Sequence, residues 1–150
     1  MPGVGAPGRD PRTRVITVAY FALICSDLLS LRADTDAAEA AWFPAYDLPP
    51  LAFDHADILA YAIQRLRYKI EYSAVAFQLL PETFTLTELQ ETYEHILDEV
   101  LDKRNFRRKV LSADVLEETP YRRSGDHRPA KLYRFREDAV AETKARRLFP

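Results

Sequence analysis

A short basic segment carries the residues of this chain that are best suited to contact with nucleic acid. Residues 102–111, DKRNFRRKVL, contain five cationic side chains within seven positions. Arginine and asparagine bind guanine and adenine edges through paired hydrogen bonds, whereas lysine and arginine also neutralise phosphates. The segment therefore has the residue types of a DNA-contacting element. These residues are Lys103, Arg104, Asn105, Arg107, Arg108 and Lys109.

The apolar residues of this segment predict a short helix that docks one edge on a core. Phe106 and Val110 lie four positions apart and share one helix face. At about 100° per residue, Arg104 and Arg108 fall roughly opposite that face, with Asn105 beside them. We assign Arg104, Asn105 and Arg108 to base edges and Lys103, Arg107 and Lys109 mostly to phosphates.

A second amphipathic helix is predicted immediately before it, over residues 87–101. Thr87 or Thr85 can cap its N-terminus, and Asp102 can cap the basic helix that follows. Two helices joined by a tight turn form a helix-turn-helix, whose second helix enters the major groove of DNA. The apolar positions with helical spacing are Leu89, Tyr93, Ile96, Leu97, Val100 and Leu101.

A β-hairpin is predicted after the helix pair. Its arms are residues 115–119 and 131–136, and its tip, residues 120–129, contains the turn-forming sequence Ser-Gly-Asp. A helix-turn-helix followed by a hairpin with a basic tip is a winged helix. We assign the cations near the tip to phosphate contacts. These cations are Arg122, Arg123 and Arg128.

The charges are distributed unevenly along the chain. Residues 82–102 contain seven acidic and no basic residues, whereas residues 103–136 contain eleven Lys and Arg against four Asp and Glu, a net charge of +7. The whole chain has a net charge of −2. Positive charge concentrated on one segment indicates a polyanion site. The alternative is a solvated charged helix and loop, and the helix pair and hairpin favour DNA.

The residues upstream predict a sheet and a helix, so the expected fold class is α+β. Residues 14–24 are nearly all apolar and predict a strand buried on both faces. A short strand is expected at 41–44 and a helix at 54–72, followed at 73–80 by a second apolar helix or the end of a bent one. A closing helix is expected at 137–148. A boundary near residue 78 would divide the chain into modules of residues 1–78 and 79–150.

The cysteine content and the apolar runs of the sequence indicate the cellular compartment of the protein. Cys25 is the single cysteine, which excludes an internal disulfide and fits a reducing cytoplasm. No apolar run approaches the length that is needed to span a bilayer. We therefore expect a cytoplasmic protein with no membrane partner.

Four segments, taken in order, resemble one known family. They are GRDPRTRVITVAYFALI, WFPAYDLPPLAFDHADIL, FTLTELQETYEHIL and LDKRNFRRK. They are similar to the Nudix-related transcriptional regulators, or NrtR family. The resemblance implies a Nudix-like module that senses ADP-ribose or a related nucleotide-sugar. It also implies a winged helix that binds a palindromic operator as a homodimer, in most cases to repress genes of NAD or sugar metabolism.

The chain departs from the family at one point. The Nudix box, G-x5-E-x7-R-E-U-x-E-E-x-G-U, would precede the RDPR segment and is absent. We therefore expect the chain to be the C-terminal part of such a protein, with a truncated Nudix-like sheet, no bound metal and no hydrolase activity. The remaining candidates for effector contact are Arg9, Asp10 and Arg12, which could instead form a loop ion pair. Two alternatives stay open: a fragment of a Nudix-type nucleotide-sugar pyrophosphatase, and a remnant that binds nothing specific.

Overall fold

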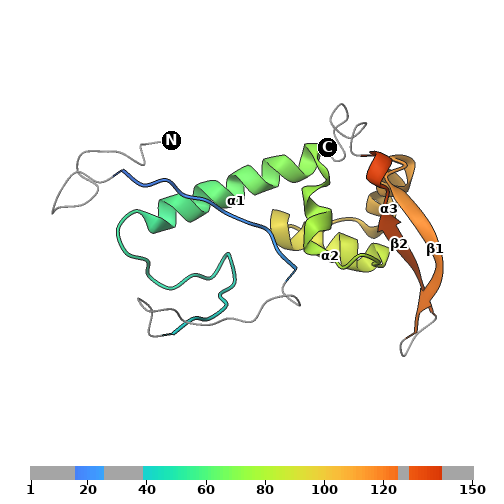
Figure 1. The fold of residues 1–150 in the computed structure, drawn as a ribbon, viewed down its shortest axis with the longest axis horizontal. Coiled ribbons are helices and arrows are strands. Elements are labelled where there is room, and N and C mark those ends of the chain that lie inside the picture. Colours follow the sequence, from blue (N-terminus) through green and yellow to red (C-terminus); the bar gives the residue numbers. More distant parts are fainter. Residues whose placement is uncertain (1–15, 26–38, 125–128, 140–150) are drawn as a thin grey trace. The chain divides into compact units, whose positions relative to one another are not determined.

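The computed structural model describes residues 16–25, 39–124 and 129–139, and its fold is α+β (Figure 1). The chain divides into two compact units, one of which includes every described residue from Leu66 onward. The helices are α1 (His55–Tyr72), α2 (Leu86–Leu97) and α3 (Lys103–Ser112), the 3-10 helices are η2 (Ala74–Leu79) and η3 (Glu137–Ala139), and the strands are β1 (Leu116–Arg123) and β2 (Ala130–Phe135).

The predicted strands at 14–24 and 41–44 are wrong over the residues that the structure describes. Residues 16–25 and 41–44 have no regular secondary structure, and Tyr20 is 91% exposed. At the second segment the chain turns instead, and the Asp47 N–H donates to the Pro44 carbonyl at 3.1 Å. A strand needs a neighbour to satisfy its backbone groups. Among the described residues no strand pairs with either segment, so apolar character alone does not produce one.

The predicted helix at 54–72 is confirmed as α1. Its apolar positions repeat at helical spacing, and Ile70, near its C-terminal end, is fully buried. Ser73 has an extended backbone and separates α1 from η2, so the second apolar helix expected at 73–80 is a short 3-10 helix. Within the described ranges, no helix is both long enough and apolar enough to cross a membrane.

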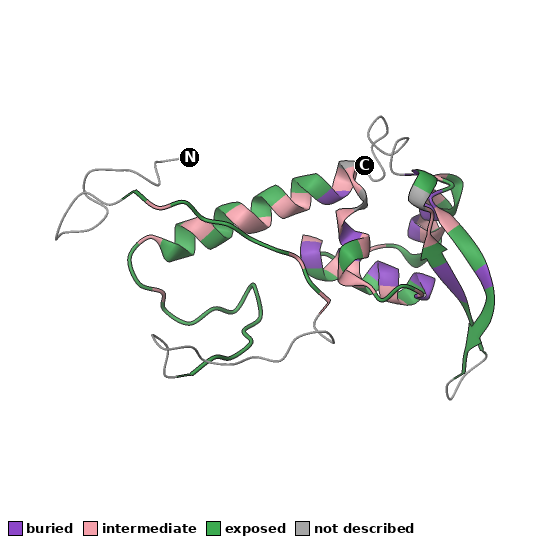
Figure 2. Cartoon of the chain, in the orientation of Figure 1, coloured by how far each residue is buried: buried purple, intermediate pink, exposed green. Residues whose placement is uncertain are grey.

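The unit that includes the residues from Leu66 onward has a hydrophobic core, to which α1, η2, α2, α3 and β2 contribute buried residues (Figure 2). Phe84 and Tyr133 exchange backbone hydrogen bonds of 2.9 and 2.8 Å, so the residues before α2 pair with β2. The sequence did not predict this bridge, because it joins segments 49 positions apart. The buried core consists of Ile70, Ala76, Phe84, Leu86, Leu89, Tyr93, Ile96, Phe106, Val110 and Tyr133.

The predicted hairpin is confirmed, but its first strand is longer than expected. β1 runs through Pro120 to Arg123, and its antiparallel register with β2 shifts between Glu118 and Arg122. Proline cannot donate to the ladder, so it is accommodated where the pairing is interrupted. The bulge therefore lets the hairpin continue beyond the point where the sequence predicted a loop. Of the closing helix expected at 137–148, the structure describes only η3, and the remainder lies outside the described residues.

Candidate nucleic-acid interface

The first helix of the pair begins with a reciprocal cap. The Glu88 N–H donates to Thr85 Oγ1 at 3.1 Å, and the Thr85 N–H donates to Glu88 Oε2 at 2.7 Å. This capping box satisfies two amides that the start of α2 would otherwise leave free. Of the two predicted caps, Thr85 is therefore the one the structure uses.

The end of α2 differs from the prediction. The helix stops at Leu97 rather than continuing to residue 101, because Asp98 takes the left-handed conformation with φ of 57°. Aspartate tolerates this conformation better than most residues, which explains a tight turn without glycine. Val100, expected on the apolar face, is 95% exposed.

A polar cluster holds the turn between α2 and α3. Glu94 Oε1 accepts hydrogen bonds from Gln90 Nε2 at 2.9 Å and from the Leu101 N–H at 2.8 Å. Gln90 Nε2 also donates to the Leu101 carbonyl at 3.0 Å. The hydrogen bond from Gln90, followed by that from Leu101, lowers the pKa of the Glu94 carboxyl below its ordinary value. Three side-chain hydrogen bonds thus fix where α3 starts.

The basic helix docks as predicted. The Asn105 N–H donates to Asp102 Oδ1 at 2.7 Å, so Asp102 is its N-cap. Phe106 is 3% exposed, and its ring meets that of Tyr93 edge-on with centroids 5.6 Å apart. Val110 is buried beside it. Burial also raises the pKa of the Tyr93 phenol, so Tyr93 stays neutral within this contact.

The remaining sides of α3 carry the cations. Lys103, Arg104 and Arg108 are exposed, whereas Asn105, Arg107 and Lys109 are half-buried. Arg108 Nη2 donates to Asn105 Oδ1 at 2.7 Å, so two of the three side chains predicted to contact bases lie together. Arg107 Nη2 donates to Thr87 Oγ1 at 3.1 Å, while its buried Nε has no hydrogen-bond partner among the described residues.

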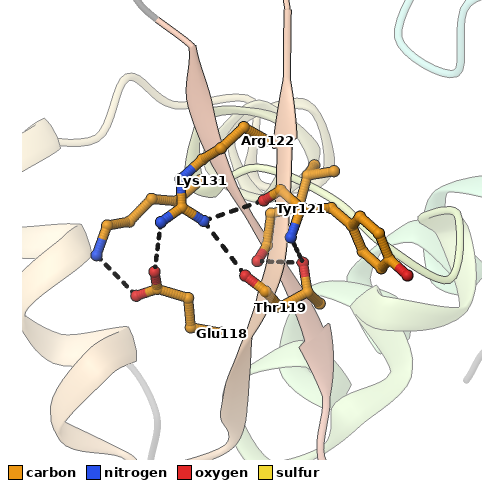
Figure 3. Close-up of polar contacts among 6 residues, drawn as sticks. Glu118, Thr119, Tyr121, Arg122 and Lys131 are labelled. Atoms are coloured by element: carbon orange, nitrogen blue, oxygen red, sulfur yellow. Dashed lines mark hydrogen bonds and ion pairs between the residues drawn. The ribbon is translucent and has the colours of Figure 1, made fainter.

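The hairpin cations, by contrast, are paired with carboxylates (Figure 3). Glu118 accepts from Arg122 Nη2 at 3.1 Å and from Lys131 Nζ at 2.7 Å. The hydrogen bond from Lys131 is the main cause that lowers the pKa of Glu118. Arg122 Nη1 also donates to the carbonyls of Thr119 and Tyr121, at 3.2 and 3.0 Å, which holds the guanidinium along the strand.

The same pattern extends along the rest of the hairpin. Arg134 pairs with Glu117 at 2.9 Å, and Arg123 pairs with Glu88 of α2. Arg136, after β2, pairs with Asp114 at 2.8 Å and with Asp138 at 2.7 Å. In the part of the chain that the structure describes, the α3 cations form no ion pair with an acid. The net charge of +7 on residues 103–136 is therefore presented mainly by α3. The count of charges in the sequence did not distinguish α3 from the hairpin.

Several predicted site residues lie outside the described residues. They are Arg128 near the hairpin tip and the effector candidates Arg9, Asp10 and Arg12. Within the described ranges, no group of three or more His, Cys, Asp or Glu is arranged to hold a metal ion.

The helix pair, the hairpin and the bridging segment before α2 together define a winged-helix protein. Residues 76–135 match the family model of the NrtR DNA-binding winged helix domain. Over 135 residues the chain is 41% identical to the ADPR responsive transcriptional repressor NtrR of Acinetobacter baylyi, covering 88% of this chain and 53% of that protein. A shorter match, 41% over 54 residues, covers 36% of this chain and 31% of an ADP-ribose pyrophosphatase of Methanocaldococcus jannaschii.

Solved structures give the same relationship. The chain is similar to Shewanella oneidensis NrtR in complex with a 27mer DNA, with a TM-score of 0.76 and 36% identity, and to Shewanella oneidensis NrtR alone, with a TM-score of 0.70 and 37% identity. Each match covers 96% of this chain and 64% of the other. The chain therefore contains a winged helix domain of the NrtR type over residues 76–135. It spans about half the length of the curated repressor it matches.

Proposed function

We propose that this chain is a DNA-binding transcriptional repressor that uses α3 as its recognition helix. One observation carries the proposal. α3 is anchored by Phe106 on the core and presents a cationic face with no acidic partner among the described residues. A face whose positive charge is not neutralised by acidic side chains is complementary to the phosphates of DNA. The DNA complex of Shewanella oneidensis NrtR, which has the same fold, supports the assignment.

The individual contacts are part of the same proposal. We assign Arg104, Asn105 and Arg108 to base edges. Two observations support this: Arg104 and Arg108 are exposed on α3, and Arg108 Nη2 donates to Asn105 Oδ1. We assign Lys103 and Lys109 to phosphates, because a lysine is a point charge without a fixed fork. Arg107 would contact a phosphate while it holds the start of α2 through Thr87. The proposed phosphate contacts of the wing are Arg122 and Arg128. Arg122 would exchange Glu118 for a phosphate, and Glu118 would keep its ion pair with Lys131.

The remaining features are inferred from the relatives and from the family resemblance of the sequence. The Acinetobacter baylyi repressor is described as ADPR-responsive, so we propose that ADP-ribose or a related nucleotide-sugar is the effector of the complete protein. We propose modules of residues 1–78 and 79–150, the second of which binds DNA. A winged helix contacts one half-site, so a palindromic operator would be bound by a homodimer. The regulated genes would belong to NAD or sugar metabolism, and the chain itself would not be an enzyme.

Fluorescence anisotropy with a labelled duplex selected from a random library tests DNA binding. If α3 supplies three phosphate contacts per site, a plot of the logarithm of affinity against the logarithm of salt concentration should have a negative slope with a magnitude of at least about 2.7. Arg108→Ala should weaken binding to the selected duplex by about 1–3 kcal/mol and relax the base preference at one base pair.

The matched control is Arg134→Ala, which removes a cation that Glu117 already neutralises. It should leave both affinity and preference near those of the wild type. A salt slope near zero for the wild type, or equal losses for the two variants, would remove the basis for assigning α3 as the recognition helix.

A further inference from the structure

The structure places one carboxylate, that of Glu88, at the junction of the helix pair and the wing, where the wing is the β1–β2 hairpin. One oxygen, Oε2, accepts from the Thr85 N–H at 2.7 Å and so caps α2. The other, Oε1, accepts from Arg123 Nη1 at the far end of β1. Arg123 Nη2 also donates to the Thr83 carbonyl at 3.4 Å. The guanidinium thus contacts both sides of the start of α2.

This contact differs from those of the neighbouring wing cations. Lys131, Arg122 and Arg134 bind carboxylates within the hairpin itself. Among the described residues of β1 and β2, Arg123 is the cation whose ion pair reaches α2. It therefore ties the wing to the helix that positions α3.

The bulge in β1 gives a structural reason for the ion pair between the wing and α2. The register shifts between Glu118 and Arg122, and beyond this point the described ladder retains two pairs, Arg122 with Lys131 and Arg123 with Ala130. We call these four residues the outer wing. A bulge leaves a residue unpaired and bends the strand. The direction of the outer wing is thus not determined by the inner ladder alone.

We propose that the Glu88–Arg123 ion pair sets the direction of the outer wing, and that Arg123 is a positioning residue rather than a phosphate contact. The inference rests on the proposed DNA-binding function. If Arg123 bound a DNA phosphate instead, the Glu88 carboxylate would lose its ion-pair partner. The carboxylate could not move away, because its hydrogen bond from the Thr85 N–H keeps it in place. The Glu88 carboxylate and the DNA phosphate would then lie close together beside the Arg123 guanidinium. Their repulsion opposes the exchange of Glu88 for a phosphate at Arg123.

The chain offers a substitution that separates the two roles of Glu88. Glu88→Gln preserves the capping box, since glutamine serves equally at this position, but removes the charge that holds Arg123. Arg123→Gln removes the other partner. Lys103→Gln, on α3, provides a reference for the loss of one phosphate contact, and Arg134→Gln removes a wing pair that does not reach α2.

Salt-dependent anisotropy on the full chain with a selected duplex tests the proposal. Glu88→Gln and Arg123→Gln should each raise Kd about two- to fivefold, the range of an exposed ion pair, and the double variant should be no weaker than either single one. Arg123→Gln should keep the wild-type salt slope, whereas Lys103→Gln should reduce its magnitude by about 0.9. A reduced slope for Arg123→Gln together with tighter binding by Glu88→Gln would overturn the proposal, as would an unchanged Kd in both.

Hydrogen exchange on the DNA-free chain separates this inference from the proposed function. Both variants should exchange faster than the wild type at the amides of residues 121–123 but not at those of 116–118, and Arg134→Gln should leave 121–123 unchanged. If the wild type binds no DNA, the proposed function fails, and this exchange pattern still decides whether the pair positions the wing. Equal exchange at 121–123 in all variants would refute the positioning role.

Discussion

Phe106 anchors the proposed recognition helix, and truncating it should undock α3. The ring is 3% exposed and meets Tyr93 edge-on at 5.6 Å. Phe106→Ala removes a buried aromatic side chain and leaves a cavity, at a cost of about 3–5 kcal/mol. That is a large share of the roughly 5–15 kcal/mol that keeps a domain folded. Phe106→Leu, which loses mainly the ring–ring contact, should cost about 0.5–1.5 kcal/mol.

Urea unfolding followed by far-UV circular dichroism, with anisotropy on the same samples, checks this expectation. The matched control is Leu111→Ala on the same helix. Leu111 is 48% exposed, so its loss should change stability by less than about 0.5 kcal/mol. Phe106→Ala should also lose DNA binding, while Phe106→Leu should keep it. If Phe106→Ala and Leu111→Ala were equally stable, the docking of α3 through Phe106 would be refuted.

Three further expectations follow from the helix pair and the proposed function. Asp98→Gly should be more stable than Asp98→Ala by about 1 kcal/mol, because both lose the same side chain and only alanine opposes the left-handed φ of 57°; equal melting temperatures would contradict this. Hydrogen bonds from Gln90 and Leu101 lower the pKa of Glu94 below its ordinary value. The contribution of the Glu94 carboxylate to folding stability is therefore fully present above the ordinary pKa and is lost as the pH falls through the lowered pKa. Protection of the Leu101 amide from exchange should therefore drop on acidification in the wild type and not in Glu94→Gln, and a parallel drop in both would assign it to another group. Incubation of the purified chain with ADP-ribose and magnesium or manganese should release no AMP above the blank, whereas steady turnover would favour the pyrophosphatase alternative.

Interactions between residues close together in the sequence were sufficient to predict the helix pair. The spacing of Phe106 and Val110, the capping residue Asp102 and the capping-box sequence from Thr85 to Glu88 act within one or two helical turns. Helix formation depends on such near neighbours, so α3 and the start of α2 follow from the order of residues. The Ser-Gly-Asp turn sequence between two candidate strands predicted the hairpin, because turn formation also depends on adjacent residues. The candidate DNA-contacting residues on α3 could therefore be named before the fold was known.

Tertiary structure decided the features that depend on distant partners. The apolar run at 16–24 does not form a strand in the described chain, because a strand requires hydrogen bonds that its own residues cannot supply. The bridge between Phe84 and Tyr133 and the pairing of Arg123 with Glu88 join segments 49 and 35 positions apart. Counting charges cannot distinguish a cation that a carboxylate already neutralises from one that is available to DNA. Among the described residues of 103–136 that distinction leaves α3 as the cationic surface, and it arises only when the chain folds and brings each carboxylate to its arginine or lysine.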